Sequence, residues 1–173
     1  MIREALKDLR QGYILSGDVA IHTEAIVESP AVIKGPAIVS RGCLVAAGAY
    51  LRQGVFLDED VVIGASCEIT RTLVFHRSRI AHLNFIGDSL VGEDVNIEAG
   101  AIVANHWNER QDKRIKVVMA GVVHETGTVK FGAVIGDRSR IGANAVTSPG
   151  TILEPDSVVS RLQLVDQAGS FGA

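Results

Sequence analysis

The sequence predicts an all-β fold in which short parallel strands are wound into a solenoid. An aliphatic residue returns at every sixth position over most of the chain, and a fixed short period of this kind is the mark of a repeat architecture. Four places after each of these positions the residue is small or slim, as at Ala25 and Ala31. Three places after them stand residues that favour tight turns, such as Pro36, Gly42 and Gly48. A short strand and a tight turn therefore alternate every six residues.

The period excludes ordinary helices and sheets, because an amphipathic helix repeats near 3.6 residues and a half-buried strand repeats at two. Three six-residue units per coil build a triangular prism, and strands stacked about 4.8 Å apart would give roughly six or seven coils. The predicted inward positions, of which Thr147 is the only polar member, are Leu15, Ile21, Val27, Ile33, Val39, Val45, Leu51, Leu57, Ile63, Ile69, Phe75, Val91, Ile97, Val103, Ile135, Ile141, Thr147, Leu153 and Val159.

A short helix is expected before the first coil. Ile2, Leu6 and Leu9 lie at helical spacing within residues 2–11. Such a helix, within residues 1–13, would cover the exposed strand edge of the first coil, which would otherwise invite aggregation.

Two breaks in the period interrupt the predicted solenoid, which we expect to span residues 14–165 and to be followed by a tail at 166–173. The six-residue spacing of the aliphatic positions changes between residues 75 and 91. The period then disappears over about 104–134, a segment that holds the only tryptophan. Connections beyond about 12 to 15 residues are uncommon and are typically functional or disordered. We therefore expect one long protruding loop with a function.

Composition and charge limit the classes of function. The apolar share of 47% and the aromatic share of 5% suit a narrow core of Val, Ile and Ala. A net charge of −3 and a pI near 5.9 argue against a general nucleic-acid binder. No signal peptide or apolar run of transmembrane length is visible, so we expect a cytoplasmic protein that does not bind membranes. Cys43 and Cys67 fall on slim inward positions, which favours small core residues over a disulfide or a metal pair.

Polar residues that are candidates for catalysis or binding lie near the two breaks in the period. A neutral histidine is the commonest general base near pH 7, although a single histidine is more often an ordinary surface or structural group. His82 stands in the segment AHLNFIGDSLVGEDVNIEAGAIVANH. This segment resembles the acetyltransferase half of the bifunctional glucosamine-1-phosphate acetyltransferase and N-acetylglucosamine-1-phosphate uridylyltransferase family, above all its archaeal-type sugar-1-phosphate nucleotidylyltransferase relatives. The resemblance extends over about residues 18–160.

The resemblance implies both fold and activity. The fold would be a single-stranded left-handed parallel β-helix of hexapeptide repeats, an exception to the usual right-handed crossover. The activity would be acetyl-CoA-dependent N-acetylation of a glucosamine-1-phosphate-like amino-sugar phosphate or a related amino sugar, with acetyl-CoA as co-substrate and no metal predicted. His82 matches the histidine that takes a proton from the sugar's 2-amino group, and a positioned base contributes about 100- to 10,000-fold. Asn96 and Asn105 match the asparagines that orient the amine and the acetyl group, with turn formation as the alternative.

The resemblance also assigns substrate-binding positions. Arg52 matches the arginine that holds the sugar phosphate, for which a planar guanidinium is suited, although it could also point to solvent. Thr70 stands where the family has a phosphate-binding lysine, with Arg71 beside it as a possible substitute. Phe85 stands where the family has a tyrosine, so the ring is kept and the hydroxyl is lost.

Further matches concern the cofactor. Lys113 and Lys116 match lysines of the long loop that would meet the sugar phosphate or the CoA phosphates, with solvated charge as the alternative. Ala143 is expected to lie against the cofactor. Glu98 replaces a glycine and brings a carboxylate close to the proposed anion site.

The family implies a homotrimer with active sites between columns, and a small-molecule amino sugar as the other partner. Its nucleotidylyltransferase domain is absent from this sequence, so uridylyl transfer is not predicted. A zinc-dependent γ-carbonic anhydrase has the same solenoid but needs a His-x-x-x-x-His run, whereas His76 and His82 are six apart. The remaining alternative is a non-catalytic trimeric module that binds a sugar nucleotide or assembles partners, which Thr70, Phe85 and Glu98 favour.

Overall fold

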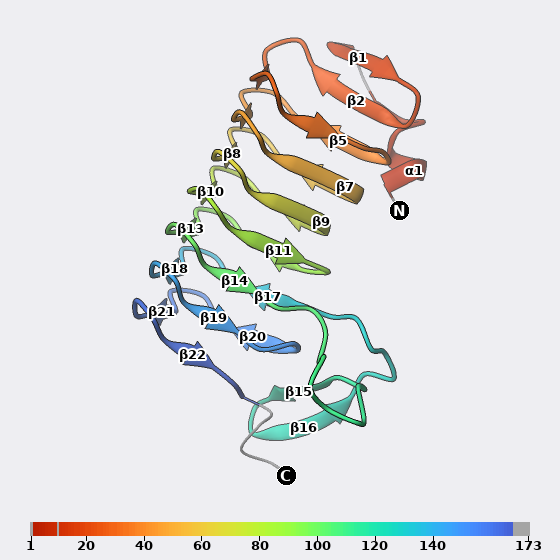
Figure 1. Ribbon diagram of the computed structural model, residues 1–173. Coiled ribbons are helices and arrows are strands. Elements are labelled where there is room, and N and C mark those ends of the chain that lie inside the picture. The colour runs from red at the N-terminus through yellow and green to blue at the C-terminus, as the bar shows by residue number, and fades with distance from the viewer. Residues whose placement is uncertain (1, 10, 168–173) are drawn as a thin grey trace.

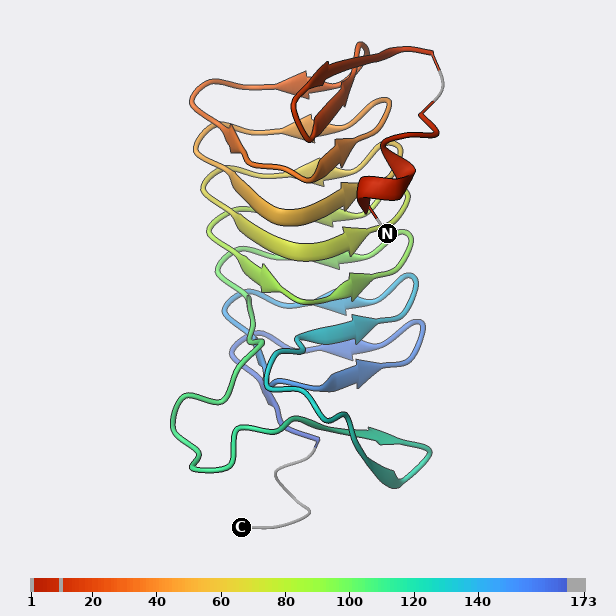
Figure 2. The same ribbon diagram turned by 90° about the vertical axis from the view of Figure 1, so that its right-hand side faces the viewer.

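The computed structural model describes residues 2–9 and 11–167, and it confirms the predicted solenoid. Parallel strands stack into a three-sided prism with β1 (Tyr13–Ser16) and β2 (Val19–His22) at one end and a long loop at the other (Figure 1). In Figure 2 the near strands run to the right and the far strands run back to the left while the chain descends, so the coil is left-handed.

Each coil visits three faces, which we number in the order that the chain follows. The first face consists of β2 (Val19–His22), β5 (Ala37–Val39), the second halves of β7 (Tyr50–Leu57) and β9 (Glu68–Val74), β12 (Leu90–Val91), β17 (Ala133–Ile135) and β20 (Thr151–Leu153). The second face is a seven-stranded sheet of β3 (Ile26–Val27), β6 (Leu44–Val45), β8 (Val62–Ile63), β10 (Arg79–Ile80), β13 (Asn96–Ile97), β18 (Arg140–Ile141) and β21 (Val158–Val159). The third face consists of β4 (Val32–Ile33), the first halves of β7 and β9, β11 (Phe85–Gly87), β14 (Ile102–Val103), β19 (Val146–Thr147) and β22 (Leu164–Val165).

The core is the column of aliphatic side chains inside the prism. Leu51, Ile63, Ile69 and Ile97 are fully buried, as the period predicted. Burying such a side chain stabilises the fold by about 1.5–3 kcal/mol, so the repeated inward positions dominate its stability. Thr147 is also buried, and its Oγ1 has no hydrogen-bond partner among the described residues.

The predicted inward position of Phe75 is wrong. Between β7 and β9, Arg52 pairs with Thr70 and Val55 with Thr72, so two residues of one coil face only Arg71 in the next. The coil is therefore one residue shorter, and the neighbouring Val74 is the residue that is fully buried. This shortening is the physical cause of the first break in the period.

The N-terminal cap also differs from the prediction. The helix α1 covers only Ile2–Ala5, has no buried residue and lies beside the prism (Figure 1). The first coil is covered instead by β1 (Tyr13–Ser16), which pairs antiparallel with β2. A strand satisfies the backbone groups of an open edge, which a helix cannot do. Leu15 lies in β1 and is 61% exposed, so its predicted inward position is wrong as well.

The predicted long loop is confirmed. It leaves the prism after β14 and returns at β17, and it extends past the C-terminal coils (Figure 2). It contains an antiparallel hairpin of β15 (Lys116–Met119) and β16 (Val122–Glu125). Trp107 and Ile115 of this loop are buried. The loop is thus a packed part of the molecule.

The two cysteines are small core residues, as predicted. Both are free and buried, and they lie at different corners of the prism. Burial raises the pKa of the Cys43 thiol to about 11. None of the described residues belongs to a helix long and apolar enough to cross a membrane. Most of the tail predicted at 166–173 lies outside the described residues.

Candidate functional site

The corner between the second and third faces, which we call the histidine corner, carries a column in which four alanines stand with His82 and Arg161. Backbone hydrogen bonds define the stacking: the N–H of Leu83 donates to the carbonyl of Ala65, that of Gly100 to His82, and that of Asn144 to Ala99. The N–H of Leu162 likewise donates to Ala143, so the stacked positions are Ala47, Ala65, His82, Ala99, Ala143 and Arg161. The small neighbours above and below leave the imidazole of His82 open to solvent.

His82 has no structural partner for its ring. It is exposed, and its side chain makes no hydrogen bond or ion pair within residues 2–9 and 11–167. In contrast, the ring nitrogens of His22, His76 and His106 each bond to the backbone, to Glu24, Glu59 and Val129 respectively. An exposed imidazole without a partner is available to accept a proton.

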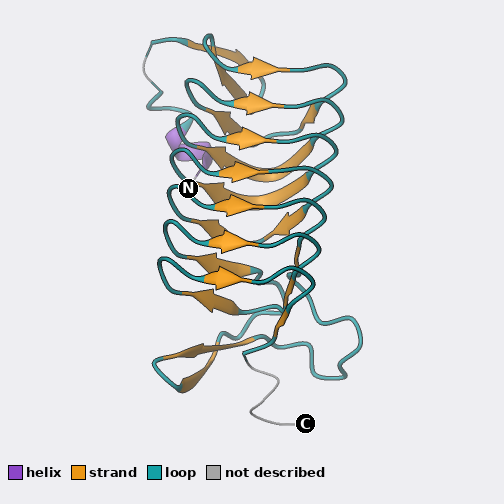
Figure 3. Cartoon of the chain, turned by 90° about the vertical axis from the view of Figure 1, so that its left-hand side faces the viewer, coloured by secondary structure: helices purple, strands orange, loops and turns teal. Residues whose placement is uncertain are grey.

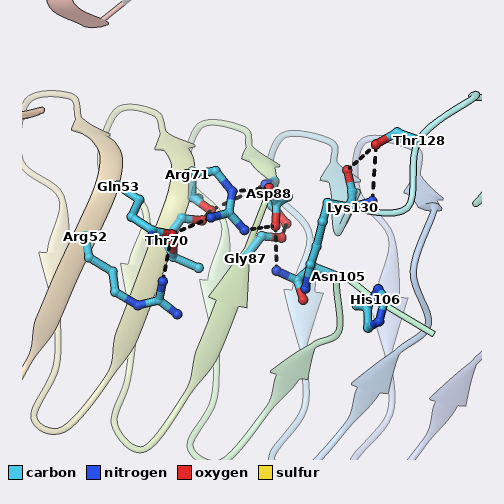
Figure 4. Close-up of polar contacts among 12 residues, drawn as sticks. Arg52, Gln53, Thr70, Arg71, Gly87, Asp88, Asn105, His106, Thr128 and Lys130 are labelled. Carbon is cyan, nitrogen blue, oxygen red and sulfur yellow. Dashed lines mark hydrogen bonds and ion pairs between the residues drawn. The ribbon is translucent and has the colours of Figure 1, made fainter. Parts of the chain in front are cut away.

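Asn105 lies at the opposite end of the third face from His82. It is buried at the corner between the third and first faces and donates from Nδ2 to Asp88 Oδ2 at 2.5 Å. Asp88 also accepts two hydrogen bonds from Arg71, from Nε to Oδ1 at 2.5 Å and from Nη2 to Oδ2 at 2.8 Å. Figure 4 shows this row, in which Arg71 lies between Gln53 and Asp88. Within one chain, the structure therefore does not bring Asn105 and His82 together.

The predicted phosphate-binding residues lie along the third face and the corner beyond it. Arg52 forms an ion pair with Glu68 at 2.6 Å. The hydrogen bond from Arg71 to Asp88 raises the pKa of Arg71 above its ordinary value. Thr70 is fully buried, and its hydroxyl faces Gln53 at 3.4 Å. Both guanidiniums are therefore already paired with carboxylates.

Phe85 begins β11, close after His82, and is half-buried. Its ring reaches back over Gly87, where an added Cβ would lie 3.0 Å from the ring and 2.4 Å from Asn105 Nδ2. A larger residue at position 87 would therefore require the side chains of Asn105 and Phe85 to shift.

The two predicted lysines belong to the long loop and are both engaged. Lys113 Nζ donates to the carbonyl of Asn108 at 3.2 Å, and Lys116 Nζ pairs with Glu125 at 3.0 Å across the hairpin. These exposed contacts are weak, since surface pairs contribute about 0–1 kcal/mol. Both ammonium groups can therefore be released to a phosphate.

Ala143 belongs to the histidine corner, but its amide is occupied. Its N–H donates to Glu98 Oε2 at 2.9 Å, and Arg161 holds the same carboxylate through two bonds of 2.8 and 2.9 Å. Arg161 and the Ala143 amide together lower the pKa of Glu98 to about 2. A cofactor that uses the Ala143 amide must displace Glu98.

Asn96 lies on the second face in β13, two residues before Glu98. Its strand neighbours are Arg79 in β10 and Arg140 in β18. The sequence reasoning missed both arginines. Arg79 falls inside the break, where the shortened coil hides the period, but Arg140 immediately precedes a predicted inward residue at a position that is apolar in earlier coils.

The sequence matches the family described as the GMPPB C-terminal domain over residues 15–115, which is more than half of the chain. The chain belongs to this family. Among relatives, a bifunctional sugar-1-phosphate nucleotidylyltransferase/acetyltransferase from Sulfurisphaera tokodaii is 37% identical over 105 residues, which are 57% of this chain and 26% of that protein. The bifunctional protein GlmU from Methanococcus vannielii is 31% identical over 105 residues, 61% of this chain and 25% of its own length. This GMPPB C-terminal domain protein thus spans about a quarter of each relative, and the predicted family resemblance is confirmed.

Two solved structures are similar in arrangement. The acetyltransferase domain of PglB from Neisseria gonorrhoeae has a TM-score of 0.31 at 21% identity, covering 82% of this chain and 54% of that one. A GDP-perosamine N-acetyl transferase from Caulobacter crescentus, in complex with CoA and GDP-perosamine, has a TM-score of 0.34 at 16% identity, covering 82% and 50%. These TM-scores are too low for positions in the two proteins to be equated with sites in this chain.

Proposed function

We propose that this protein is an acetyl-CoA-dependent N-acetyltransferase that acts on an amino-sugar phosphate or a related amino sugar, with His82 as general base. The observation that carries the proposal is the exposed, unpartnered imidazole stacked between Ala65 and Ala99. Relatives named as acetyltransferases that also act on sugar 1-phosphates support the choice of donor and acceptor.

The chemistry requires a base at this position. An ammonium group has no lone pair, so the sugar nitrogen becomes a nucleophile only after a proton leaves it. That first proton passes to solvent, and His82 takes the second proton from the neutral amine as its nitrogen attacks the thioester carbonyl. A C–N bond forms, the C–S bond breaks, and the departing thiolate takes the proton from the imidazolium. Ala65 and Ala99, which stack on either side of His82, have small side chains, and the imidazole is exposed.

A homotrimer is part of the proposal. His82 and Asn105 lie at opposite ends of the third face, and Lys113 and Lys116 belong to a loop that extends beyond the C-terminal coils. A second copy packed against the first would add its own loop to the histidine corner. Sedimentation equilibrium should then give three times the chain mass of 18.4 kDa, and a monomer at active concentrations would rule out a shared site.

The decisive test is release of free thiol from acetyl-CoA in the presence of amino sugars and their 1-phosphates. We expect at least one acceptor to be acetylated, and His82→Ala to lower kcat about 100- to 10,000-fold. His124→Ala is the matched control, because His124 is also exposed and also lacks a hydrogen-bond partner among the described residues, but lies on the hairpin in β16. Full activity in His82→Ala, or no acetylation of any acceptor, would refute the proposal.

A second function is favoured by one observation. Glu98 occupies the amide of Ala143, which would block a cofactor there. The protein would then be a non-catalytic module that binds a sugar nucleotide or assembles partners. Saturable binding of a sugar nucleotide without thiol release in the same assay would select this function.

A further inference from the structure

The outward column of the second face changes character halfway along the prism. The registered outward positions, one per coil, are Ile26, Leu44, Val62, Arg79, Asn96, Arg140 and Val158. The strands that carry them form the continuous stack that faces the viewer in Figure 3. Three consecutive polar residues interrupt an otherwise apolar column. The backbone register is unbroken there, so the fold does not require the change.

These three side chains have few partners of their own. Arg79 and Asn96 make no side-chain hydrogen bond or ion pair in the part of the chain that the structure describes. Arg140 is held only through Nη1, which donates to the carbonyls of Asp94, Arg138 and Ser139 at 2.7, 3.0 and 3.2 Å. The remaining donors of its guanidinium make no hydrogen bond to residues 2–9 or 11–167, while the backbone contacts fix its orientation. The group is therefore held in place with donors to spare.

A hollow of about 390 Å³ lies over these residues. Four arginines and one aspartate line it: Arg77, Arg79, Arg138, Arg140 and Asp94. Two of the arginines are neutralised, since Arg77 pairs with Asp94 and Arg138 with Asp156. Of the other two, Arg79 forms no ion pair with a carboxylate in the described part of the chain, and Arg140 forms none either, although its charge helps to lower the pKa of Asp94 and of Asp156. The hollow is thus positive in a protein whose net charge is −3.

We infer that Arg79, Asn96 and Arg140 form a binding site for the diphosphate group of a ligand. A guanidinium offers paired donors that match phosphate oxygens, and the asparagine amide adds a third donor between the two cations. Two rungs of a parallel sheet separate the arginine Cα atoms by about 10 Å. Their long side chains can converge from that distance on two adjacent phosphates. A single carboxylate would not need two guanidiniums placed this far apart.

A second hollow gives the ligand a direction. It has a volume of about 210 Å³, shares Asn96 and Arg140 with the first, and continues along the face past Ile141 and Val158 to Arg161 at the histidine corner. Ile141, Gly142, Val158 and Val159 form the apolar part of its lining, beside the Glu98–Arg161 ion pair, and this part suits an uncharged arm that follows the phosphates. Both CoA and a sugar nucleotide carry a diphosphate with such an extension, and the inference does not depend on acetyl transfer.

The test is binding of inorganic pyrophosphate to the whole chain by titration calorimetry at fixed ionic strength. Saturable binding is expected, and Arg79→Gln or Arg140→Gln should each weaken it at least about tenfold, as loss of a charge-assisted hydrogen bond does. Arg41→Gln is the matched control, since Arg41 is an exposed arginine paired with Glu59 in an earlier coil. Absence of saturable binding, or equal weakening by Arg41→Gln, would overturn the assignment. Circular dichroism of each variant excludes loss of the fold as the cause.

Competition then separates the two sources of a diphosphate. Displacement of pyrophosphate by CoA identifies the acyl carrier, and displacement by UDP identifies a sugar nucleotide. Displacement by neither would overturn the assignment to a diphosphate ligand. Inorganic phosphate is the further control, because a site built from two separated guanidiniums should prefer pyrophosphate to it.

Discussion

The first and the middle coils of the prism have the same backbone arrangement on the second face, but their outward side chains differ. On the second face, Leu44 and Val62 occupy the outward positions of early coils, where later coils have Arg79 and Asn96. The inward residues do not change in the same way, since Ile63, Ile80 and Ile97 are all fully buried. The inward side of the strands therefore determines the fold. The outward side is free to vary, which is why polar residues can replace apolar ones there without a change in the backbone register.

The histidine corner repeats this lesson in another column. Ala47 and Ala65 precede His82, and Ala99 follows it, without any change in the backbone hydrogen bonds. The side chain of His82 makes no hydrogen bond to the described residues, so the backbone stacking at this corner does not depend on it.

The largest effect on stability should come from the inward side. Ile80→Ala removes a fully buried side chain and should lower the free energy of unfolding by about 2–5 kcal/mol. Its exposed neighbour in the same strand, Arg79→Ala, should change it by no more than about 0.5 kcal/mol. Urea unfolding of the two variants measures both values. Equal losses would break the distinction between the two sides of the strand.

A smaller effect should follow from Asp88→Asn at the corner between the third and first faces. This carboxylate accepts hydrogen bonds from Arg71 and Asn105 and its side chain is 13% exposed, so its loss should cost about 1–3 kcal/mol. Asp156→Asn breaks a comparable bidentate pair with Arg138 in which Asp156 is 65% exposed, and should cost about 0–1 kcal/mol. If the two variants unfold at the same urea concentration, the polar row of Figure 4 does not stabilise the fold.

The smallest effect concerns Glu98 and depends on pH. Its pKa in the folded protein is lowered from 4.5 to about 2, so its contribution is fully present above about 4.5 and is lost as the pH falls through 2. The Glu98→Gln variant should therefore unfold at a slightly lower urea concentration than the wild type at pH 7. The difference between the two midpoints should shrink as the pH falls from 4.5 to 2. Glu109→Gln, which removes an exposed carboxylate without a hydrogen-bond partner among the described residues, is the control. A pH-independent difference would contradict the role of Arg161.

The period predicted the coil and its core because every coil buries the same kinds of aliphatic side chain at equivalent inward positions. It did not predict the shortened coil, where Gln53 and Arg71 adopt positive φ angles of 60° and 46°. Turn composition gives no sign of this, since neither residue is a usual turn former with positive φ. The prediction that a helix caps the first coil was wrong. Strand β1 pairs with the edge strand β2 instead, and this pairing outweighs the local helical spacing of the residues before it.

The candidate site was predicted only in part. The motif around His82 marked His82, Phe85, Asn96 and Asn105, while the column in which His82 stacks between alanines became visible only with the three-dimensional register. Asn105 and Asp88 are seventeen residues apart and meet through coil stacking, which a linear motif does not contain. Arg79 was missed because a one-residue change in coil length shifts every later position.

The central claim is that the unpartnered polar residues serve ligands and not the fold. A variant that restores the regular columns, His82→Ala with Arg79→Val and Asn96→Val, tests it through one quantity, the free energy of unfolding in urea. Each replacement is the residue type that neighbouring coils carry at that position. We predict a free energy within about 1 kcal/mol of the wild type, since exposed substitutions contribute only a few tenths each. A loss of more than about 3 kcal/mol would show that these residues hold the prism together, and would contradict the account.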